Sequence, residues 1–305
     1  MANIVGLGEA LFDVYADGRE VVGGAPLNFA VHASRLGRVI GKTAAIVSRV
    51  GRDPRGAAIR SFLTEAGTVV DFLQEDAVRP TGWAPVTLDA DGQASFEIVR
   101  DVAWDYIETT ADLEALASRC ELVCYGTLGQ RSPVSRLTIE DFLVQAKGAL
   151  RLFDVNLRQS SYDYSMLRRG CALATALKLN VEELSVLASM LTLRGSSAGD
   201  RVLSLFERFP IEVVILTRGA AGTVIYTPNG RFEGKPAVYE PEAGADSVGA
   251  GDAATAAAAV AMLAGHSLDH VVKVANHAGG FVASRHGATP VLPYEILRMM
   301  DRRST

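Results

Sequence analysis

Short apolar runs alternate with helical patterns along this chain, and that alternation restricts its fold more than any other feature. The apolar runs that read as buried strands are Ile4–Gly8, Glu121–Tyr125, Leu150–Val155, Ala176–Asn180 and Val213–Thr217. The patterns that read as helices include Asp112–Cys120, Arg136–Gly148 and Ser197–Phe209. Strands that alternate with helices join through right-handed crossovers into a parallel sheet covered on both faces. We therefore predict an α/β fold with a central, mostly parallel sheet flanked by helices, in the manner of a Rossmann fold.

Two stretches interrupt this alternation and predict a smaller sheet, which we call the lid. Leu11–Val22 alternates apolar and polar residues around Asp17-Gly18, and Ala84–Val99 does so around Asp91-Gly92. Asp-Gly between alternating strands favours a hairpin. We expect residues of about 11–23 and 84–104 to form the lid. Because no linker sets the lid apart, we expect residues 1–305 to form a single domain. We also expect a homodimer that pairs through the lid.

Composition excludes several other classes of protein. The 305 residues are 49% hydrophobic and 21% charged, which suits a globular protein with a sizeable core. A net charge of -5 argues against a nucleic-acid partner, since such proteins need a basic face. The N-terminus lacks a signal-peptide pattern, and Ala253–Ala264 is too short to span a bilayer. The three cysteines have no CxxC spacing, so we expect free buried thiols in a cytoplasmic protein without a membrane partner.

The strongest chemical signal is Asp246-Ser247-Val248-Gly249-Ala250-Gly251-Asp252, which opens an Ala-rich helix. Glycine backbone can approach a ligand closely, and amides at a helix start attract anions. A carboxylate at the same helix start can take a proton from an attacking hydroxyl. The alternative is a tight turn in which Asp252 merely caps the helix.

That heptapeptide resembles the C-terminal signature of ribokinase-like (PfkB) carbohydrate kinases, and other motifs of the family occur in the expected order. They are Gly23–Ala30, Gly51–Gly56, Asp154–Arg158, Asn180–Glu183 and Thr217–Gly222. The resemblance extends from about residue 4 to about residue 290. It implies a ribokinase-like fold and transfer of the γ-phosphate of ATP to a hydroxyl of a small carbohydrate.

The resemblance also implies roles at the reacting centre. Asp252 would be the general base, the amides of Gly249, Ala250 and Gly251 would stabilise charge on the phosphoryl group, and Arg158 would offer its guanidinium fork. The expected sugar-binding residues are Asp13, Gly23, Gly24, Asn28, Phe96 and Arg100, with Trp104 closing over the sugar beside the last two. Read without the family, Asp13 could be an exposed strand charge and Asn28 an ordinary residue in a helix that runs to Arg35.

On the nucleotide side, the resemblance implies a second set of residues: Asn180, Glu183, Thr217, Gly219, Gly222, Gly249, Gly251 and Asn276. Glu183 would act on Mg²⁺ through water, which suits an ion that keeps several waters. The loop Arg285–Ala288, with the backbone of Asp246 and Val248, would hold a monovalent cation such as K⁺. From the residues alone, Asn180 and Glu183 could be a polar cluster at a helix start, and Asn276 a polar residue on a solvent face.

Within the family, Gly8–Asp13 and Tyr125–Arg131 most resemble bacterial fructokinases, so we predict fructose as the substrate. A kinase of the same family that acts on 2-keto-3-deoxygluconate, ribose or a nucleoside is the nearest alternative, and a non-catalytic sugar-binding regulator is another. A Rossmann dehydrogenase is disfavoured because Gly6-Leu7-Gly8 lacks the third glycine of the dinucleotide fingerprint. One departure from the family is Ala254, where a Phe is usual.

Overall fold

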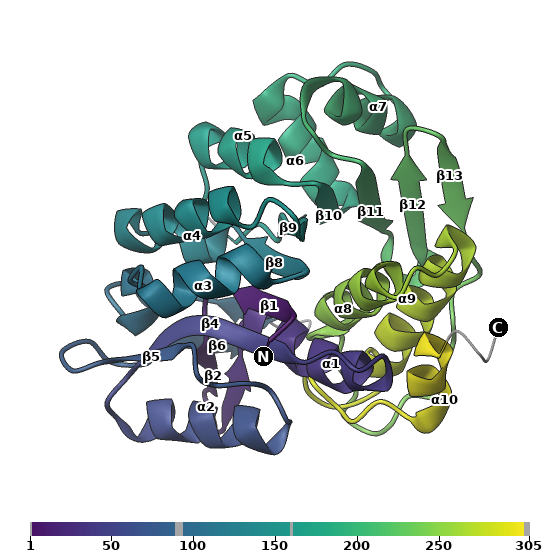
Figure 1. Cartoon of the computed structure of the whole chain (residues 1–305). Helices are drawn as coiled ribbons and strands as arrows, with labels where there is room; N and C mark the ends of the chain where they lie inside the picture. Colours follow the sequence, from purple (N-terminus) through teal and green to yellow (C-terminus); the bar gives the residue numbers. More distant parts are fainter. Residues whose placement is uncertain (1, 89–93, 159–160, 302–305) are drawn as a thin grey trace.

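The computed structural model describes residues 2–88, 94–158 and 161–301, and a long sheet forms its centre (Figure 1). Within these residues the sheet has nine strands in the order β13-β12-β11-β10-β9-β8-β1-β4-β5. Their bounds are β1 Ile4–Leu7, β4 Ala44–Gly51, β5 Leu73–Asp76, β8 Leu122–Gly126, β9 Leu150–Asp154, β10 Ala176–Asn180, β11 Val213–Thr217, β12 Thr223–Thr227 and β13 Gly230–Glu233.

Neighbouring strands from β11 to β5 pair in parallel, whereas β12 and β13 are added antiparallel at one edge. All the strands predicted from apolar runs are present within a residue or so of their expected ends. The prediction of a mostly parallel sheet is therefore confirmed. The patterns above did not single out β4, β5 or β13, because each of these strands mixes polar with apolar residues.

Helices cover both faces of the sheet. One apolar cluster packs α3 to α7 against one face, and a second packs α1, α8, α9 and α10 against the other. The helices are α1 Ala25–Val39, α2 Pro54–Glu65, α3 Ala111–Arg119, α4 Pro133–Gln145, α5 Tyr164–Leu173, α6 Val181–Leu191, α7 Ala198–Arg208, α8 Ala250–Leu263, α9 Leu268–Val282 and α10 Tyr294–Leu297. Small residues all round α8 let it lie buried between its neighbours.

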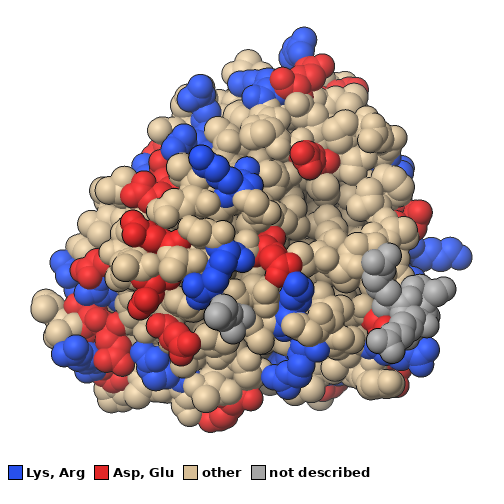
Figure 2. Space-filling model, viewed as in Figure 1, with Lys and Arg blue, Asp and Glu red and all other residues tan. Residues whose placement is uncertain are grey.

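The remaining composition-based predictions concern the buried thiols, the membrane and the surface. Cys120, Cys124 and Cys171 are buried and free, as expected. Among the described residues, no helix has the length and apolar character needed to cross a bilayer. Basic and acidic side chains are interspersed on the face seen in Figure 2.

The lid is a sheet of strands in the order β3-β2-β6-β7. Strands β2 Leu11–Tyr15 and β3 Glu20–Gly23 form one antiparallel pair, and β6 Gly82–Leu88 and β7 Ala94–Phe96 form the other. Both predicted hairpin pairings are confirmed, although the Asp91-Gly92 turn lies outside the described residues. Because β2 follows β1 directly and β3 leads into α1, the lid is attached at the carboxyl end of a central strand.

The expectation that the lid extends to residue 104 is wrong at its end. Trp104 has no exposed surface and lies in a short 3₁₀ turn, with the Arg131 guanidinium 3.9 Å from its ring centroid. Because the indole is enclosed in this way, it is not free to close over a sugar. Arg100 is exposed beyond β7. The backbone of Phe96 pairs with Val86, and its side chain lies outside what the structure describes.

Candidate active site

Several of the predicted functional residues lie at or just beyond the carboxyl ends of β9, β10 and β11. Glu9 follows β1, Arg158 follows β9, and Asn180 and Thr217 end β10 and β11. The carboxyl edge is where open parallel sheets bind ligands, because strand ends and helix starts converge there. The parallel sheet thus brings residues that are far apart in the sequence together at its carboxyl edge.

Asp252 lies in the first turn of α8 and is half-buried. The side-chain nitrogen of Asn28, from α1, donates a hydrogen bond of 2.8 Å to its Oδ2. Asn28 is buried, and its Oδ1 has no partner among the described residues. Asn28 is therefore more than an ordinary helix residue, because its side chain holds the Asp252 carboxylate.

A buried cation, the ammonium of Lys178, acts on Asp252. Lys178 on β10 donates from Nζ to Oδ1 of Asp154 on β9 at 3.0 Å. Burial raises the pKa of Asp252, while Lys178, the Asn28 hydrogen bond and Arg158 act to lower it. Asp252 is consequently a stronger base than a surface aspartate and still has cations that favour its charged form.

The Lys178 ammonium stays protonated despite its burial. Burial alone would lower its pKa, but the carboxylates of Asp154, Glu183 and Asp252 outweigh burial and raise it. The sequence analysis gave Lys178 no role. A signal was present nonetheless, since a charge inside the buried strand Ala176–Asn180 requires a partner.

On the lid side, Asp13 and the Gly23-Gly24 turn lie together. A Cβ on Gly23 would lie 2.8 Å from Oδ2 of Asp13, so the carboxylate faces bare backbone. Gly24 has a φ of 112°, and a Cβ there would lie 2.6 Å from the carbonyl oxygen of Glu9. Burial raises the pKa of Asp13 to about 6, with Arg158 opposing the shift. Asp13 is thus half-buried and is not an exposed strand charge.

Arg158 and Glu9 complete this side of the site. The exposed guanidinium of Arg158 acts electrostatically on Glu9, Asp13 and Asp252. Glu9 is buried, and its Oε2 has no partner among the described residues. Burial raises the pKa of Glu9 to about 7, and the charge on Asp252 adds to the rise. In the sequence, Glu9 was noted only as part of the motif Gly8–Asp13, and its burial was not predicted.

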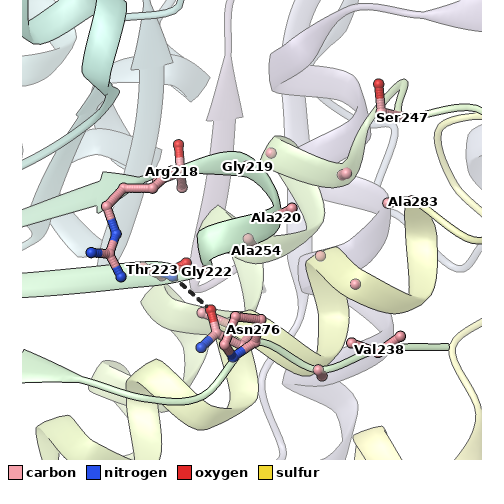
Figure 3. A pocket seen from close by; sticks show the side chains of 18 of the residues that line it. Arg218, Gly219, Ala220, Gly222, Thr223, Val238, Ser247, Ala254, Asn276 and Ala283 are labelled. Atoms are coloured by element: carbon pink, nitrogen blue, oxygen red, sulfur yellow. Dashed lines mark hydrogen bonds between the residues drawn. The ribbon is translucent and has the colours of Figure 1, made fainter.

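A pocket of about 980 Å³ opens on the other side of Asp252 (Figure 3). Its walls include the predicted nucleotide-side residues Asn180, Thr217, Gly219, Gly222, Gly251 and Asn276. The sequence analysis missed other lining residues, among them Arg218, Pro236, Val238 and Tyr239. Ala254 also lines the pocket, so the residue that replaces the family's usual Phe leaves space there. The largely apolar walls suit a flat aromatic ring.

Asn276, one of the predicted nucleotide-side residues, has structural partners. Oδ1 of Asn276 accepts from the Thr223 amide at 2.8 Å (Figure 3). Its Nδ2 donates to the Lys235 carbonyl at 3.1 Å. Asn276 is buried, so the alternative of a solvent-facing residue is wrong. Because these contacts engage both polar atoms of its side chain, Asn276 fixes the shape of the pocket wall.

Asn180 and Glu183 form a reciprocal cap at the start of α6. Oδ1 of Asn180 accepts from the Glu183 amide at 2.7 Å, and Oε2 of Glu183 accepts from the Asn180 amide at 2.8 Å. Oε1 of Glu183 accepts from the Leu157 amide at 3.1 Å. The polar-cluster alternative is therefore present in the structure. Within the part of the chain that the structure describes, no three acids, histidines or cysteines are grouped so that they could hold a metal ion.

Gly249 faces the loop after α9 and does not line the pocket. Its φ is 75°, and a Cβ on it would lie 2.4 Å from the carbonyl oxygen of Ala288. Asp246 joins the same two segments, because its Oδ1 accepts from the Val248 amide at 2.9 Å and its Oδ2 from the Gly287 amide at 3.3 Å. The segments expected to hold a monovalent cation are therefore side by side.

The amides at the start of α8 are not all available to a ligand. The amide of Ala250 donates to the Ser247 carbonyl at 3.2 Å, which closes the turn before the helix. Gly251, one residue further on, lines the pocket. The first turn of a helix leaves amides without intrahelical partners, so an anion can bind at this end.

Known proteins resemble this chain in sequence and in fold. The family model described as pfkB family carbohydrate kinase matches residues 13–294. A fructokinase of Klebsiella pneumoniae is 30% identical, covering 95% of each chain. A Vibrio cholerae O395 fructokinase structure in a fructose, ADP and calcium ion bound form has a TM-score of 0.82 at 25% identity, covering 98% of this chain and 99% of that one. An uncharacterized sugar kinase from Pyrococcus horikoshii in complex with ATP has a TM-score of 0.80 at 26% identity, covering 97% and 99%.

Substituting Gly249 tests the contact between the α8 turn and the Ala288 loop. We expect Gly249→Ala to lower the free energy of unfolding by about 2–4 kcal/mol, because a positive φ and a clash with a carbonyl act together. Gly287→Ala is the matched control, since Gly287 has a φ of 80° but no atom within 4 Å of its Cβ position. Urea denaturation measures both variants, and equal losses would contradict the assigned contact.

Glu9 makes a prediction about pH and stability. Its carboxyl has a folded pKa of about 7 against an ordinary 4.5, so the stability it contributes is full below pH 4.5 and is lost as the pH rises through 7. Glu9→Gln should therefore stabilise the protein more at pH 8 than at pH 5, by about 1–3 kcal/mol. Thermal or urea unfolding at the two pH values checks this. The exposed Glu114→Gln should show no such difference, and a Glu9→Gln effect independent of pH would refute the assignment.

Proposed function

Since the chain belongs to the pfkB family of carbohydrate kinases, and is thus a phosphotransferase with a sugar hydroxyl as acceptor, we propose that it is a fructokinase with Asp252 as general base. The observation that carries the proposal is the position of Asp252. Its carboxylate is held by Asn28 on the lid side, and Gly251 next to it lines the large pocket. A hydroxyl and a terminal phosphate can therefore meet beside one base.

The proposed reaction is positioning combined with charge stabilisation, as in other phosphoryl transfers. Bound ATP with Mg²⁺ supplies the phosphoryl group and offsets its charge. Asp252 accepts the proton of the attacking hydroxyl, and Asn28 keeps the carboxylate in place. Asp13 and the Gly23-Gly24 turn bind the sugar, and the lid excludes water, which limits hydrolysis. Amides at the start of α8 and the Arg158 fork receive the negative charge of the phosphoryl group.

The charges around Asp252 favour a neutral sugar. Glu9, Asp13 and Asp252 are acids, and Arg158 is a cation that acts on all three. A substrate with its own carboxylate, such as 2-keto-3-deoxygluconate, would add a like charge there. The relative from Klebsiella pneumoniae is named a fructokinase, and the Vibrio cholerae structure contains fructose. Fructose is therefore a better proposal than a sugar acid.

Three further features belong to the same proposal. The nucleotide lies in the pocket lined by Thr217, Gly219 and Gly222, with Asn276 supporting its wall. A monovalent cation, K⁺ in our proposal, binds to carbonyls between Asp246, Val248 and the Arg285–Ala288 loop. Two copies pair through the lid as a homodimer.

A panel of acceptors tests the choice of sugar. We expect ADP release from ATP and Mg²⁺ to be fastest with fructose, with kcat/KM at least about tenfold above that for ribose, a nucleoside or 2-keto-3-deoxygluconate. A coupled ADP assay with and without K⁺ measures this. Preference for the sugar acid would overturn fructose while leaving the kinase assignment intact.

Replacing the base tests the mechanism. Asp252→Asn keeps the shape of the side chain but cannot accept the proton, so kcat should fall by at least about 10²-fold with little change in the fold. Asp269→Asn, an exposed acid in the first turn of α9, is the matched control and should retain full activity. Near-normal turnover by a folded Asp252→Asn protein would refute the role of Asp252.

A further inference from the structure

We propose that Lys178 is a positioning residue for phosphoryl transfer: held by Asp154, its buried ammonium keeps Asp252 in the charged form that accepts the proton. The inference rests on the proposed function and adds to it a residue that acts through the base. Lys178 lies on β10, in the middle of the sheet, while Asp252 lies on α8 above it.

The register of the sheet fixes the ammonium. Lys178 and Asp154 are directly opposite each other in the parallel pair β10–β9, and Nζ lies 3.0 Å from Oδ1 of Asp154. Their side chains are only 8% and 6% exposed. Because both backbones are fixed by strand pairing and the side chains are enclosed, the charge cannot move away into solvent.

The ammonium also lies against the first turn of α8. A Cβ on Gly251 would lie 3.4 Å from Nζ of Lys178, and Asp252 is the next residue. The missing side chain at Gly251 therefore leaves room for the lysine as well as for a ligand. Among the groups that act on Asp252, Lys178 opposes the effect of burial more than Asn28 or Arg158 does.

The other charged or titratable groups near Asp252 explain why one buried cation matters. They are Glu9 after β1, Cys124 on β8, Asp154 on β9 and Arg158 beyond β9, while Glu183 on α6 acts on Asp154 and Lys178. Glu9 and Asp154 are acids, so they disfavour a further negative charge on Asp252. Arg158 is exposed, where water and salt weaken its effect. Lys178 is the enclosed cation of this group.

A purely structural role explains the pair less well. Burying two charges carries a large desolvation penalty, and apolar residues of similar volume often stabilise a fold equally well or better. The other residues of β10 before its last position, Ala176, Leu177 and Leu179, are apolar and fully buried. An ion pair retained in such a strand beside the base is therefore better explained by its effect on Asp252.

The test is the pH profile of kcat/KM for Lys178→Met. Without the ammonium, Asp252 binds its proton more tightly, so the midpoint of the acidic limb should move up by about one pH unit or more. On the acidic side of the limb, kcat/KM should fall about tenfold. Lys178→Arg keeps the charge and should leave the midpoint near that of the wild type. Lys147→Met, an exposed lysine after α4, is the matched control.

Folding of the single variant is controlled by a double variant. Lys178→Met alone leaves Asp154 buried without its partner, whereas Asp154→Asn with Lys178→Met removes both charges. Because Asp154 itself disfavours a charge on Asp252, the reference for the double variant is Asp154→Asn alone, and the midpoint of the double variant should lie above that of this reference. If the folded double variant has the midpoint of Asp154→Asn, Lys178 is structural and the proposal is overturned.

A second readout separates this proposal from the function on which it rests. Difference infrared spectra, with Asp252→Asn used to assign the band, report the protonation of the Asp252 carboxyl without turnover. If the wild type phosphorylates no sugar, the kinase proposal fails, yet an upward shift of this titration in Lys178→Met would still support the role of Lys178. An unmoved titration would overturn that role even in an active kinase.

Discussion

A carboxylate that acts as a base must be shielded from water and yet stay charged, and this requirement at Asp252 accounts for much of the surrounding structure. Burial strengthens Asp252 as a base, while the Asn28 hydrogen bond and the Lys178 ammonium favour its charged form. Meeting both conditions needs groups from α1, β10 and α8, which are far apart in the chain. The parallel sheet brings them together, because its carboxyl edge collects strand ends and helix starts in one place.

Much of this arrangement could be predicted from sequence, because the signals involved are local. Apolar runs identified the central strands, and Asp-Gly pairs identified both lid hairpins. In the Gly23-Gly24 and Gly249–Gly251 motifs, a side chain would crowd neighbouring atoms, which explains the glycines. At Gly249 the crowding atoms belong to Ala288 and not to a ligand. Motifs also identified six lining residues of the pocket, of which five end or follow a strand or open a helix, whereas Asn276 lies within α9.

What the sequence could not supply are contacts between distant elements. Nothing near Asn28 indicates that its amide is bonded to Asp252, and nothing near Asn276 indicates that its amide secures the backbone of Thr223. Trp104 was expected at the lid surface but is enclosed, because its packing depends on Arg131, which comes much later in the chain. A charged residue inside an apolar strand, as at Lys178, is a usable signal, but its partner appears only once the strand register is known.

A crystal structure with fructose and a non-hydrolysable ATP analogue would test the role of Asp252 as the base. The quantity to measure is the distance from the Asp252 carboxylate to the acceptor hydroxyl. If Asp252 is the general base, this distance should be about 2.6–3.2 Å, with the terminal phosphate on the far side of that hydroxyl. A sugar bound elsewhere, or a carboxylate turned away from it into the packing of α1 and α8, would contradict the central role of Asp252.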